Sequence, residues 1–303
     1  MSGKIRFGIF LPQIYLWPQM KQEAQRIEAL GFDSLWIADH FVSPYSESAD
    51  WFECWSLLGA LAASTTRIRL GTGVTHVVYR NPAILARSAL TVDHISDGRL
   101  DLGMGVGSGG AYNYAMTGTP AQRLGERVDR YREAVTLIDQ LLQNEMTTYE
   151  GQFFQAYDAP MHPRPVQQPR PPFNLAAHYP RALKIAAEFG EAWNSFYPGD
   201  DLTPEQSSQV THQRGEMLSE LALQFGRDPA EIRRTFFAGY SSDHPFASAD
   251  AFQDFIGRYR EAGIDEFVLG YAPGIDELSG DWMVTADELE RYTSLIGDWQ
   301  LNI

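Results

Sequence analysis

Apolar and polar positions alternate along this chain with two different periods. From residue 5 to residue 11 every second position is apolar, and Pro12 ends the run, which is typical of a strand. Residues 20–30 instead place apolar side chains three and four positions apart, which indicates a helix. By these criteria the predicted strands cover residues 5–11, 34–38, 67–74, 99–106, 173–177, 191–196, 233–240 and 266–270. The predicted helices cover about residues 20–30, 51–64, 82–95, 121–144, 181–189, 203–226, 248–262 and 286–299.

Strands and helices therefore follow one another in strict alternation. Such an order implies parallel strands joined by right-handed crossovers, and eight repeats predict a (β/α)8 TIM barrel of the α/β class, formed as a single domain by residues 1–303. Two segments depart from the alternation. Residues 147–154 suggest a short hairpin around Gly151, and the proline-rich residues 155–172, after the fourth strand and its helix, are expected to be an extended insertion across the barrel mouth.

One predicted strand is followed at once by an acid and a histidine. The continuous apolar run of residues 35–38 is typical of a parallel strand covered on both faces, and Asp39 and His40 come directly after it. In a barrel of this kind the carboxyl ends of the strands carry the chemistry. Asp39 and His40 are therefore candidate reactive groups, although an isolated pair of this kind more often only caps a loop.

Three further strand ends are rich in small residues. Glycines within residues 71–74 suggest a bulge with a ligand against the backbone, and the glycine-rich stretch 103–110 exposes successive N–H groups that suit an anion or a ring carbonyl. Residues 176–181 lead from two alanines to a helix start suited to phosphate. Each feature alone has a structural explanation. Together, at one mouth, they predict a flat, partly apolar ligand that carries a phosphate.

The composition of the chain excludes several classes of protein. Hydrophobic residues make up 44% of the 303 residues without any apolar run of about 18 residues, so no transmembrane span is expected, and the absence of a signal-peptide pattern predicts a cytoplasmic protein. The formal net charge of −15 argues against nucleic acid or an anionic membrane as a partner. The single Cys54 excludes internal disulfides, and the seven histidines show no metal-binding spacing, so no metal site is predicted.

Six stretches resemble the luciferase-like monooxygenase superfamily, and the resemblance extends over nearly the whole chain. They read, in order, SLWIADHF, RLGTGVTHVVYRNPAILA, SDGRLDLGMGVGSG, GERVDRYREAVTLI, PRPVQQPRPP and PRALKIAAEFGEAWN. The resemblance implies a TIM-barrel enzyme that uses reduced FMN with oxygen, or the deazaflavin coenzyme F-420 as a hydride carrier. The DHF, GTGV and YRNPA motifs are most similar to the F-420-dependent branch.

The resemblance also implies roles for particular residues. Asp39 and His40 would approach the reactive central ring, with His40 as proton donor or acceptor. Gly73 and Val74 would form the bulge behind the ring, with a cis peptide bond between them. The cofactor contacts implied in this way are Asp39, His40, Thr72, Gly73, Val74, Gly107, Ser108, Gly109, Ala176, Ala177, His178 and Arg181. Some F-420 dehydrogenases carry a glutamate at the place of Gly110, and its absence here argues against a sugar-phosphate dehydrogenase.

The resulting hypothesis is hydride transfer between F-420 and a small, electron-poor organic substrate, with His40 delivering the proton. The substrate would contact the aromatic residues Phe10, Tyr15, Trp17, Tyr45 and Trp51, although many of these could equally be core. Two alternatives stay open: an FMN-dependent monooxygenase, and a non-catalytic flavin-binding protein on the same fold. The resemblance further implies a homodimer, paired through the helices of residues 51–61 and 82–90.

Overall fold

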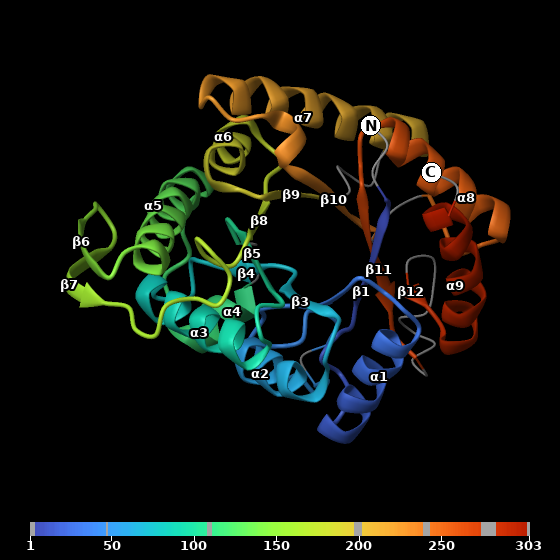
Figure 1. Cartoon of the computed structure of the whole chain (residues 1–303), viewed down its shortest axis with the longest axis horizontal. Coiled ribbons are helices and arrows are strands. Elements are labelled where there is room, and N and C mark those ends of the chain that lie inside the picture. Colours follow the sequence, from blue (N-terminus) through green and yellow to red (C-terminus); the bar gives the residue numbers. More distant parts are fainter. Residues whose placement is uncertain are drawn as a thin grey trace. The chain divides into compact units, whose positions relative to one another are not determined.

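Short buried strands, most of them followed by a helix, recur along the chain (Figure 1). The computed structural model describes residues 4–46, 48–107, 111–196, 202–238, 243–273 and 283–301. The chain divides into two units, which are treated separately below. Unit 1 comprises residues 1–12, 26–36 and 177–303, and unit 2 comprises residues 13–25 and 37–176.

Unit 1 contains five parallel strands in the order β2-β1-β11-β10-β9. They are β1 (Arg6–Phe10), β2 (Ser34–Ile37), whose last residue falls in unit 2, β9 (Ala192–Phe196), β10 (Arg233–Ala238) and β11 (Glu266–Tyr271). The short β12 (Met283–Val284) pairs with β11. Nearly all of their residues are buried, as expected of parallel strands covered by helices.

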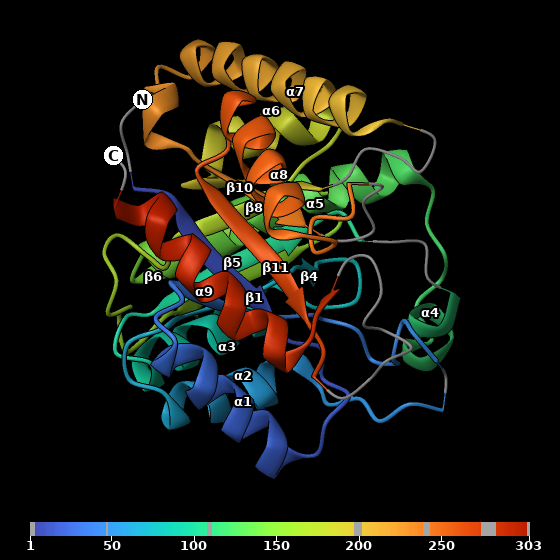
Figure 2. The same ribbon diagram turned by 90° about the vertical axis from the view of Figure 1, so that its right-hand side faces the viewer.

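The helices of unit 1 are α6 (Pro180–Phe189), α7 (Pro204–Gln224), α8 (Ala249–Glu261) and α9 (Ala286–Leu301), with a 3-10 turn at Pro229–Glu231. Helix α7 packs along α6 and α8 (Figure 2). The Thr203 side chain accepts from Gln206 N while the Gln206 side chain accepts from Thr203 N, and the two bonds form a capping box. This box fixes where α7 begins.

Unit 2 contains three parallel strands in the order β3-β5-β8. They are β3 (Arg69–Thr72), β5 (Leu100–Gly105) and β8 (Phe173–Ala176), and the two-residue β4 (Thr75–His76) pairs with the end of β5. The helices are α1 (Trp17–Ala29), whose last residues fall in unit 1, α2 (Cys54–Ser64), α3 (Pro82–Ile95), α4 (Ala111–Thr117) and α5 (Leu124–Gln143). A Cβ at Gly103 would lie only 1.7 Å from the Thr72 carbonyl oxygen, so β3 and β5 require glycine at this position.

The eight parallel strands of the two units correspond one for one to the eight predicted strands, and the (β/α)8 TIM-barrel class is confirmed. The short α4 was not predicted. The organisation of residues 1–303 as a single domain stays a prediction. Among the described helices, none has the length and apolar character needed to cross a membrane.

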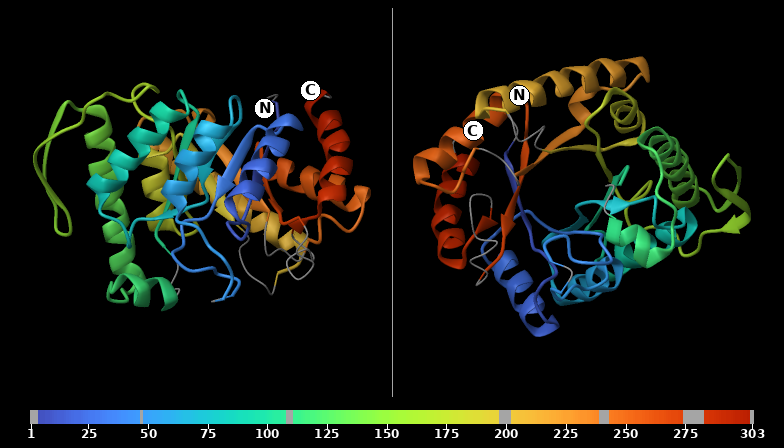
Figure 3. Two further views of the ribbon diagram at one scale, coloured as in Figure 1. Left: turned by 90° about the horizontal axis from the view of Figure 1, so that it is seen from below. Right: turned by 180° about the vertical axis from the view of Figure 1, so that it is seen from behind.

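The predicted hairpin is present in unit 2. Strands β6 (Met146–Glu150) and β7 (Gln155–Pro160) pair antiparallel, with Gly151 in the turn between them. The hairpin lies at the periphery of unit 2, beyond α5, in two views (Figures 1 and 3).

The proline-rich residues 155–172 do not lie at the barrel mouth, where they were predicted to lie. Residues 155–160 form β7, and the backbone N–H groups of Val166 and Gln167 donate to the Asp93 carboxylate at 2.7 and 3.2 Å. The Gln167 side chain also donates to the Leu100 carbonyl at 2.8 Å, at the beginning of β5. The segment therefore runs along the amino ends of the strands, and the prediction that it crosses the mouth was wrong. The physical reason is the fully buried Asp93, which needs N–H donors and finds them here.

Candidate functional site

Asp39 is held in an ion pair within unit 2. Both carboxylate oxygens accept from Arg80, with Nε to Oδ2 at 2.7 Å and Nη2 to Oδ1 at 2.6 Å. Arg80 Nη2 also contacts Glu53 Oε1 at 2.6 Å, and Glu53 caps the start of α2 by accepting from Trp55 N and Ser56 N. Such a bidentate pair fixes the geometry of the loop after β2. The arrangement favours a positioning role for Asp39.

The electrostatics of this network depend on burial. The Asp39 side chain is 2% exposed, and burial raises the pKa of Asp39 while the bonds from Arg80 act in the opposite direction. Burial alone would lower the pKa of Arg80, but its bonds to Asp39 and then Glu53 raise that pKa above its ordinary value. The guanidinium is therefore charged at any pH at which the protein is folded.

His40 is half-buried and held from two sides. Its Nδ1 lies 2.9 Å from Asn113 Nδ2 on α4, and its backbone carbonyl accepts from Trp51 Nε1 at 2.8 Å. Asn113 is fixed in turn, because its Oδ1 accepts from Phe41 N at 2.8 Å. Burial lowers the pKa of His40, and the neighbouring Asp39 carboxylate partly offsets that effect. His40 is therefore mostly neutral at pH 7.

A second histidine, His76 on β4, lies against the first. The ring centroids of His40 and His76 are 4.9 Å apart, with the rings edge to face. His76 is only 7% exposed, and its Nδ1 has no hydrogen-bond partner in the described part of the chain. Burial, followed by the nearby His40, Arg127 and Arg80, lowers the pKa of His76 to about 3. The site thus contains two adjacent neutral imidazoles.

Sequence reasoning missed both His76 and Asn113. The two-residue strand β4 is too short to leave a periodic pattern, and α4 follows a glycine-rich turn that hides its start. The TH pair directly after GTGV, at a strand end, was the available signal for His76.

Aromatic rings line the surroundings of His40. Trp51 lies 6.3 Å from the His40 ring and 6.1 Å from Tyr45. On the other side Tyr79 lies 5.7 Å from His76 and 5.0 Å from Tyr114. Burial raises the pKa of Tyr79 to about 12, with Tyr114 contributing, so its hydroxyl stays protonated. These rings form a surface suited to a flat or apolar molecule.

The predicted substrate residues are thus only partly brought together. Tyr45 and Trp51 lie near His40. Tyr15 is buried just before α1, and burial, followed by the charge of Glu23, raises its pKa. Trp17 is the first residue of α1 and is half-buried. Phe10 is a buried residue of unit 1 that meets the Phe237 ring edge-on at 4.9 Å.

A corner built from small residues lies at the carboxyl ends of β3, β5 and β8 in unit 2. The peptide bond between Gly73 and Val74 is cis, as predicted. The Thr72 hydroxyl donates to the Gly103 carbonyl at 2.6 Å. A Cβ at Gly105 would lie 2.6 Å from Val74 Cγ2 and 3.4 Å from the Ala176 Cβ. A side chain could not be added at Gly105 without a shift, so glycine allows β5 to pack closely against Val74 and Ala176.

The glycine-rich turn is only partly described. Gly107 has φ +89°, in the left-handed region, and its carbonyl accepts from Arg127 Nη1 at 2.5 Å. Ser108, Gly109 and Gly110 lie outside the described residues. The predicted cofactor contacts of Ser108 and Gly109 stay predictions.

In unit 1 the start of α6 has the features of an anion site. Tyr179, at the N-cap, makes no side-chain capping bond, and Arg181 is exposed in the first turn. Next to them, burial and the charge of Arg214 lower the pKa of the half-buried His178 to about 4. Arg214 comes from α7 and donates to the Phe196 carbonyl at 3.3 Å. Sequence reasoning missed it because it belongs to a different helix.

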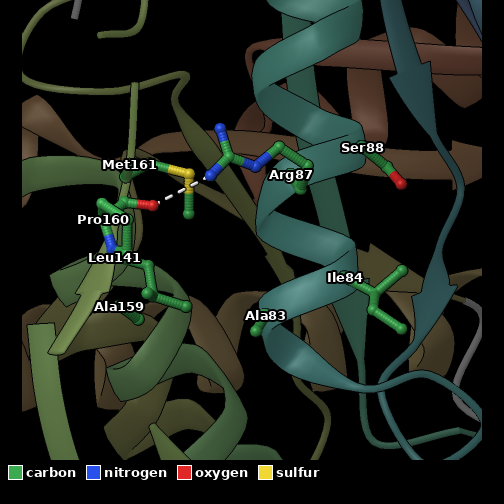
Figure 4. Close-up of a pocket in the computed structure, with 8 residues that line it drawn as sticks. All are labelled: Ala83, Ile84, Arg87, Ser88, Leu141, Ala159, Pro160 and Met161. Atoms are coloured by element: carbon green, nitrogen blue, oxygen red, sulfur yellow. Dashed lines mark hydrogen bonds between the residues drawn. The ribbon is translucent and has the colours of Figure 1, made fainter. Parts of the chain in front are cut away.

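A pocket of about 350 Å³ also lies in unit 2 (Figure 4). Its lining residues are Ala83, Ile84, Arg87, Ser88, Leu141, Ala159, Pro160 and Met161. Arg87 Nη2 donates to the Pro160 carbonyl at 2.9 Å. This pocket shares no residue with the predicted site. Within the described ranges, no cluster of three metal-ligating side chains occurs.

Comparison with known proteins gives consistent relatives. Residues 6–300 match the model of the family described as luciferase-like monooxygenase. The chain is 34% identical over 225 residues to an F420-dependent glucose-6-phosphate dehydrogenase of Kineococcus radiotolerans. This alignment covers 69% of this chain and 64% of the relative. It is 31% identical over 199 residues to a 5,10-methylenetetrahydromethanopterin reductase of Archaeoglobus fulgidus, covering 65% of this chain and 55% of the relative. The chain thus spans less than two thirds of the length of these curated relatives.

Among solved structures, an F420-dependent secondary alcohol dehydrogenase in complex with an F420-acetone adduct superimposes with a TM-score of 0.81 at 21% identity. The match covers 97% of this chain and 99% of that chain. At this identity the likeness establishes the fold.

Proposed function

The chain belongs to the luciferase-like monooxygenase family, and on that basis we propose that it is an F-420-dependent oxidoreductase that transfers a hydride between the deazaflavin and a small organic substrate. The observation that carries the proposal is His40, a half-buried neutral imidazole held by Asn113 and Trp51 among aromatic rings. A group held in this way can meet a substrate oxygen reproducibly.

The residues present fit the cofactor. In unit 2 the ring would lie against the cis peptide of Gly73 and Val74 beside the closely packed Gly105, and the unpartnered His76 Nδ1 would be a polar contact. In unit 1 the uncapped start of α6, with His178 and Arg214, is a candidate phosphate site. When bound, the deazaflavin supplies or accepts the hydride. The protein orients the substrate, excludes water with its aromatic rings and places a hydrogen-bonding group, His40, at the reacting oxygen.

The relatives favour F-420 over FMN, since the dehydrogenase of Kineococcus and the structurally similar alcohol dehydrogenase are both named for it. The substrate class is narrowed by the rings of Tyr45, Trp51 and Tyr79 around His40, which suit a planar or apolar molecule.

A side-by-side titration tests the proposal. The purified protein is titrated with oxidised F-420 and with FMN, and binding is followed by fluorescence. Tight binding of F-420 and weak binding of FMN is the expected result. Tight FMN binding with NADH-driven oxygen uptake would instead support the monooxygenase alternative, and absence of turnover with either cofactor would support the non-catalytic one.

Replacing Arg214 with methionine is expected to weaken F-420 binding roughly 10- to 100-fold, because a charge-assisted hydrogen bond to a phosphate is lost. Affinity is measured by fluorescence titration. The phosphate-free deazaflavin chromophore should bind both proteins equally. His212→Gln, an exposed change on the same helix, is the control and should leave both affinities unchanged. Equal loss for both ligands would exclude a phosphate contact.

We also propose that the protein is a cytoplasmic homodimer. The supporting feature is α3, where Ile84 is 66% exposed. Sedimentation equilibrium tests the oligomeric state.

A further inference from the structure

The orientation of the Asn113 side chain follows from its partners. Asn113 is 4% exposed, so its amide has little access to water. Phe41 N can only donate a hydrogen bond, and it lies 2.8 Å from one end of the amide, so that end is the oxygen, Oδ1. The other end, 2.9 Å from His40 Nδ1, is therefore the NH2 group.

This orientation determines where the His40 proton is. An NH2 group only donates, so His40 Nδ1 must accept and carries no hydrogen. In a neutral imidazole one nitrogen bears the proton, and here it is Nε2. Protonation of Nδ1 would set two donors against each other. Asn113 therefore adds to burial in keeping His40 neutral.

We infer that Asn113 is a positioning residue that fixes His40 as the neutral, Nε2-protonated tautomer, so that His40 meets the substrate oxygen as a hydrogen-bond donor through Nε2. The statement about the substrate rests on the proposed function, whereas the statement about the tautomer does not. Within the described residues the hydrogen bonds of His40 involve Nδ1 and the backbone carbonyl, which leaves Nε2 for a ligand. A neutral imidazole placed in this way stabilises negative charge that develops on an oxygen.

The charged and titratable groups around His40 are compatible with this state. The Asp39 carboxylate forms an ion pair with Arg80, which also forms an ion pair with Glu53. His76 is neutral and meets His40 through its ring. The other charged or titratable groups near the two imidazoles are Asp39, Tyr79, Arg80, Tyr114 and Arg127, and Glu53 is connected to them through Arg80.

Nitrogen-15 NMR of the full chain, without cofactor, tests the tautomer directly. Two-bond proton–nitrogen correlations distinguish the two neutral forms of histidine, and the His40 signals are assigned by their loss in His40→Gln. The expected pattern for His40 is a protonated Nε2 and an unprotonated Nδ1. In Asn113→Asp the new carboxylate accepts a hydrogen bond, so Nδ1 should become protonated and the pKa of His40 should rise.

Asn113→Ala is the second variant. It removes the donor without adding an acceptor and should give a mixture of the two tautomers. Thr117→Val is the matched control, because the hydrogen bonds of Thr117 Oγ1 to described residues reach the backbone carbonyls of Asn113 and Tyr114 and the Thr119 hydroxyl, but not the Asn113 side chain. It should leave the His40 signals unchanged. A wild-type His40 with its proton on Nδ1, or an Asn113→Asp protein with unchanged signals, would overturn the inference.

The pH profile of turnover is the functional readout. If neutral His40 is the working form, activity should be level above pH 7 and fall as acid protonates the ring. The falling limb should move to higher pH in Asn113→Asp. A wild-type activity that rises on acidification would show that the imidazolium is the working form and would overturn the donor role. If the protein were inactive but His40 showed the expected tautomer, the proposed function would be wrong, while the inference that Asn113 fixes the tautomer would still hold.

Discussion

Replacing His40 with glutamine is expected to lower kcat by roughly 10²- to 10⁴-fold while F-420 affinity changes only a few-fold. The reason is that the imidazole would contribute where charge develops in the reaction, whereas the cofactor contacts proposed above do not depend on the His40 side chain alone. Steady-state kinetics and fluorescence titration measure the two quantities separately.

The control for this variant is His94→Gln, an exposed histidine on α3 that bonds to the Arg164 carbonyl. It should retain full turnover. If His40→Gln turned over like the wild type, His40 would have no part in the reaction, and a parallel loss of cofactor affinity would make it a binding residue instead.

The largest effect on stability is expected at Arg80. Arg80→Met should lower the free energy of unfolding by about 3–5 kcal/mol, because it leaves the buried Asp39 carboxylate without a counter-ion. Urea unfolding followed by circular dichroism measures the loss. Burial raises the pKa of Asp39 above its unfolded value, so lowering the pH protonates the folded protein first, and the deficit should shrink as the pH falls.

Two comparisons isolate this effect. Arg130→Met removes a partly exposed pair with Glu126 and should cost about 0–1 kcal/mol. The double variant Asp39→Asn with Arg80→Met should recover part of the loss, because no buried charge remains. A deficit in Arg80→Met no larger than that of Arg130→Met would show that the buried ion pair contributes little.

The parts of the fold that could be predicted are those determined by residues that are close together in the sequence. The strand from residue 34 to residue 38 was visible because apolar residues follow one another without a break. The start of α3 was visible because Pro82 suits the first turn of a helix, and the start of α7 because Thr203 has a side chain that caps helices. The position of the proline-rich segment has a distant cause, the contact between Asp93 and Val166. No local pattern reports such a contact.

The same distinction explains the site. Asp39 and His40 were predicted as site residues because they follow a strand directly in the sequence. Asn113, His76 and Arg214 were not, since each acquires its place only when another element folds against it. The tautomer of His40 depends on Asn113, which is far from His40 and Phe41 in the chain, and only coordinates reveal this contact.

The attachment of the proline-rich segment at the amino ends of β3 and β5 has a use in protein engineering. Val166 and Gln167 of this segment hydrogen-bond to the Asp93 carboxylate and the Leu100 carbonyl. These contacts lie at the amino ends of the strands, whereas the loop that carries His40 follows the carboxyl end of β2. Loops from relatives with other substrate preferences can therefore be grafted around His40 while this tether is left untouched. Stability and selectivity then become separate design variables, because the tether at the amino ends of β3 and β5 and the loop after β2 are different segments of the chain.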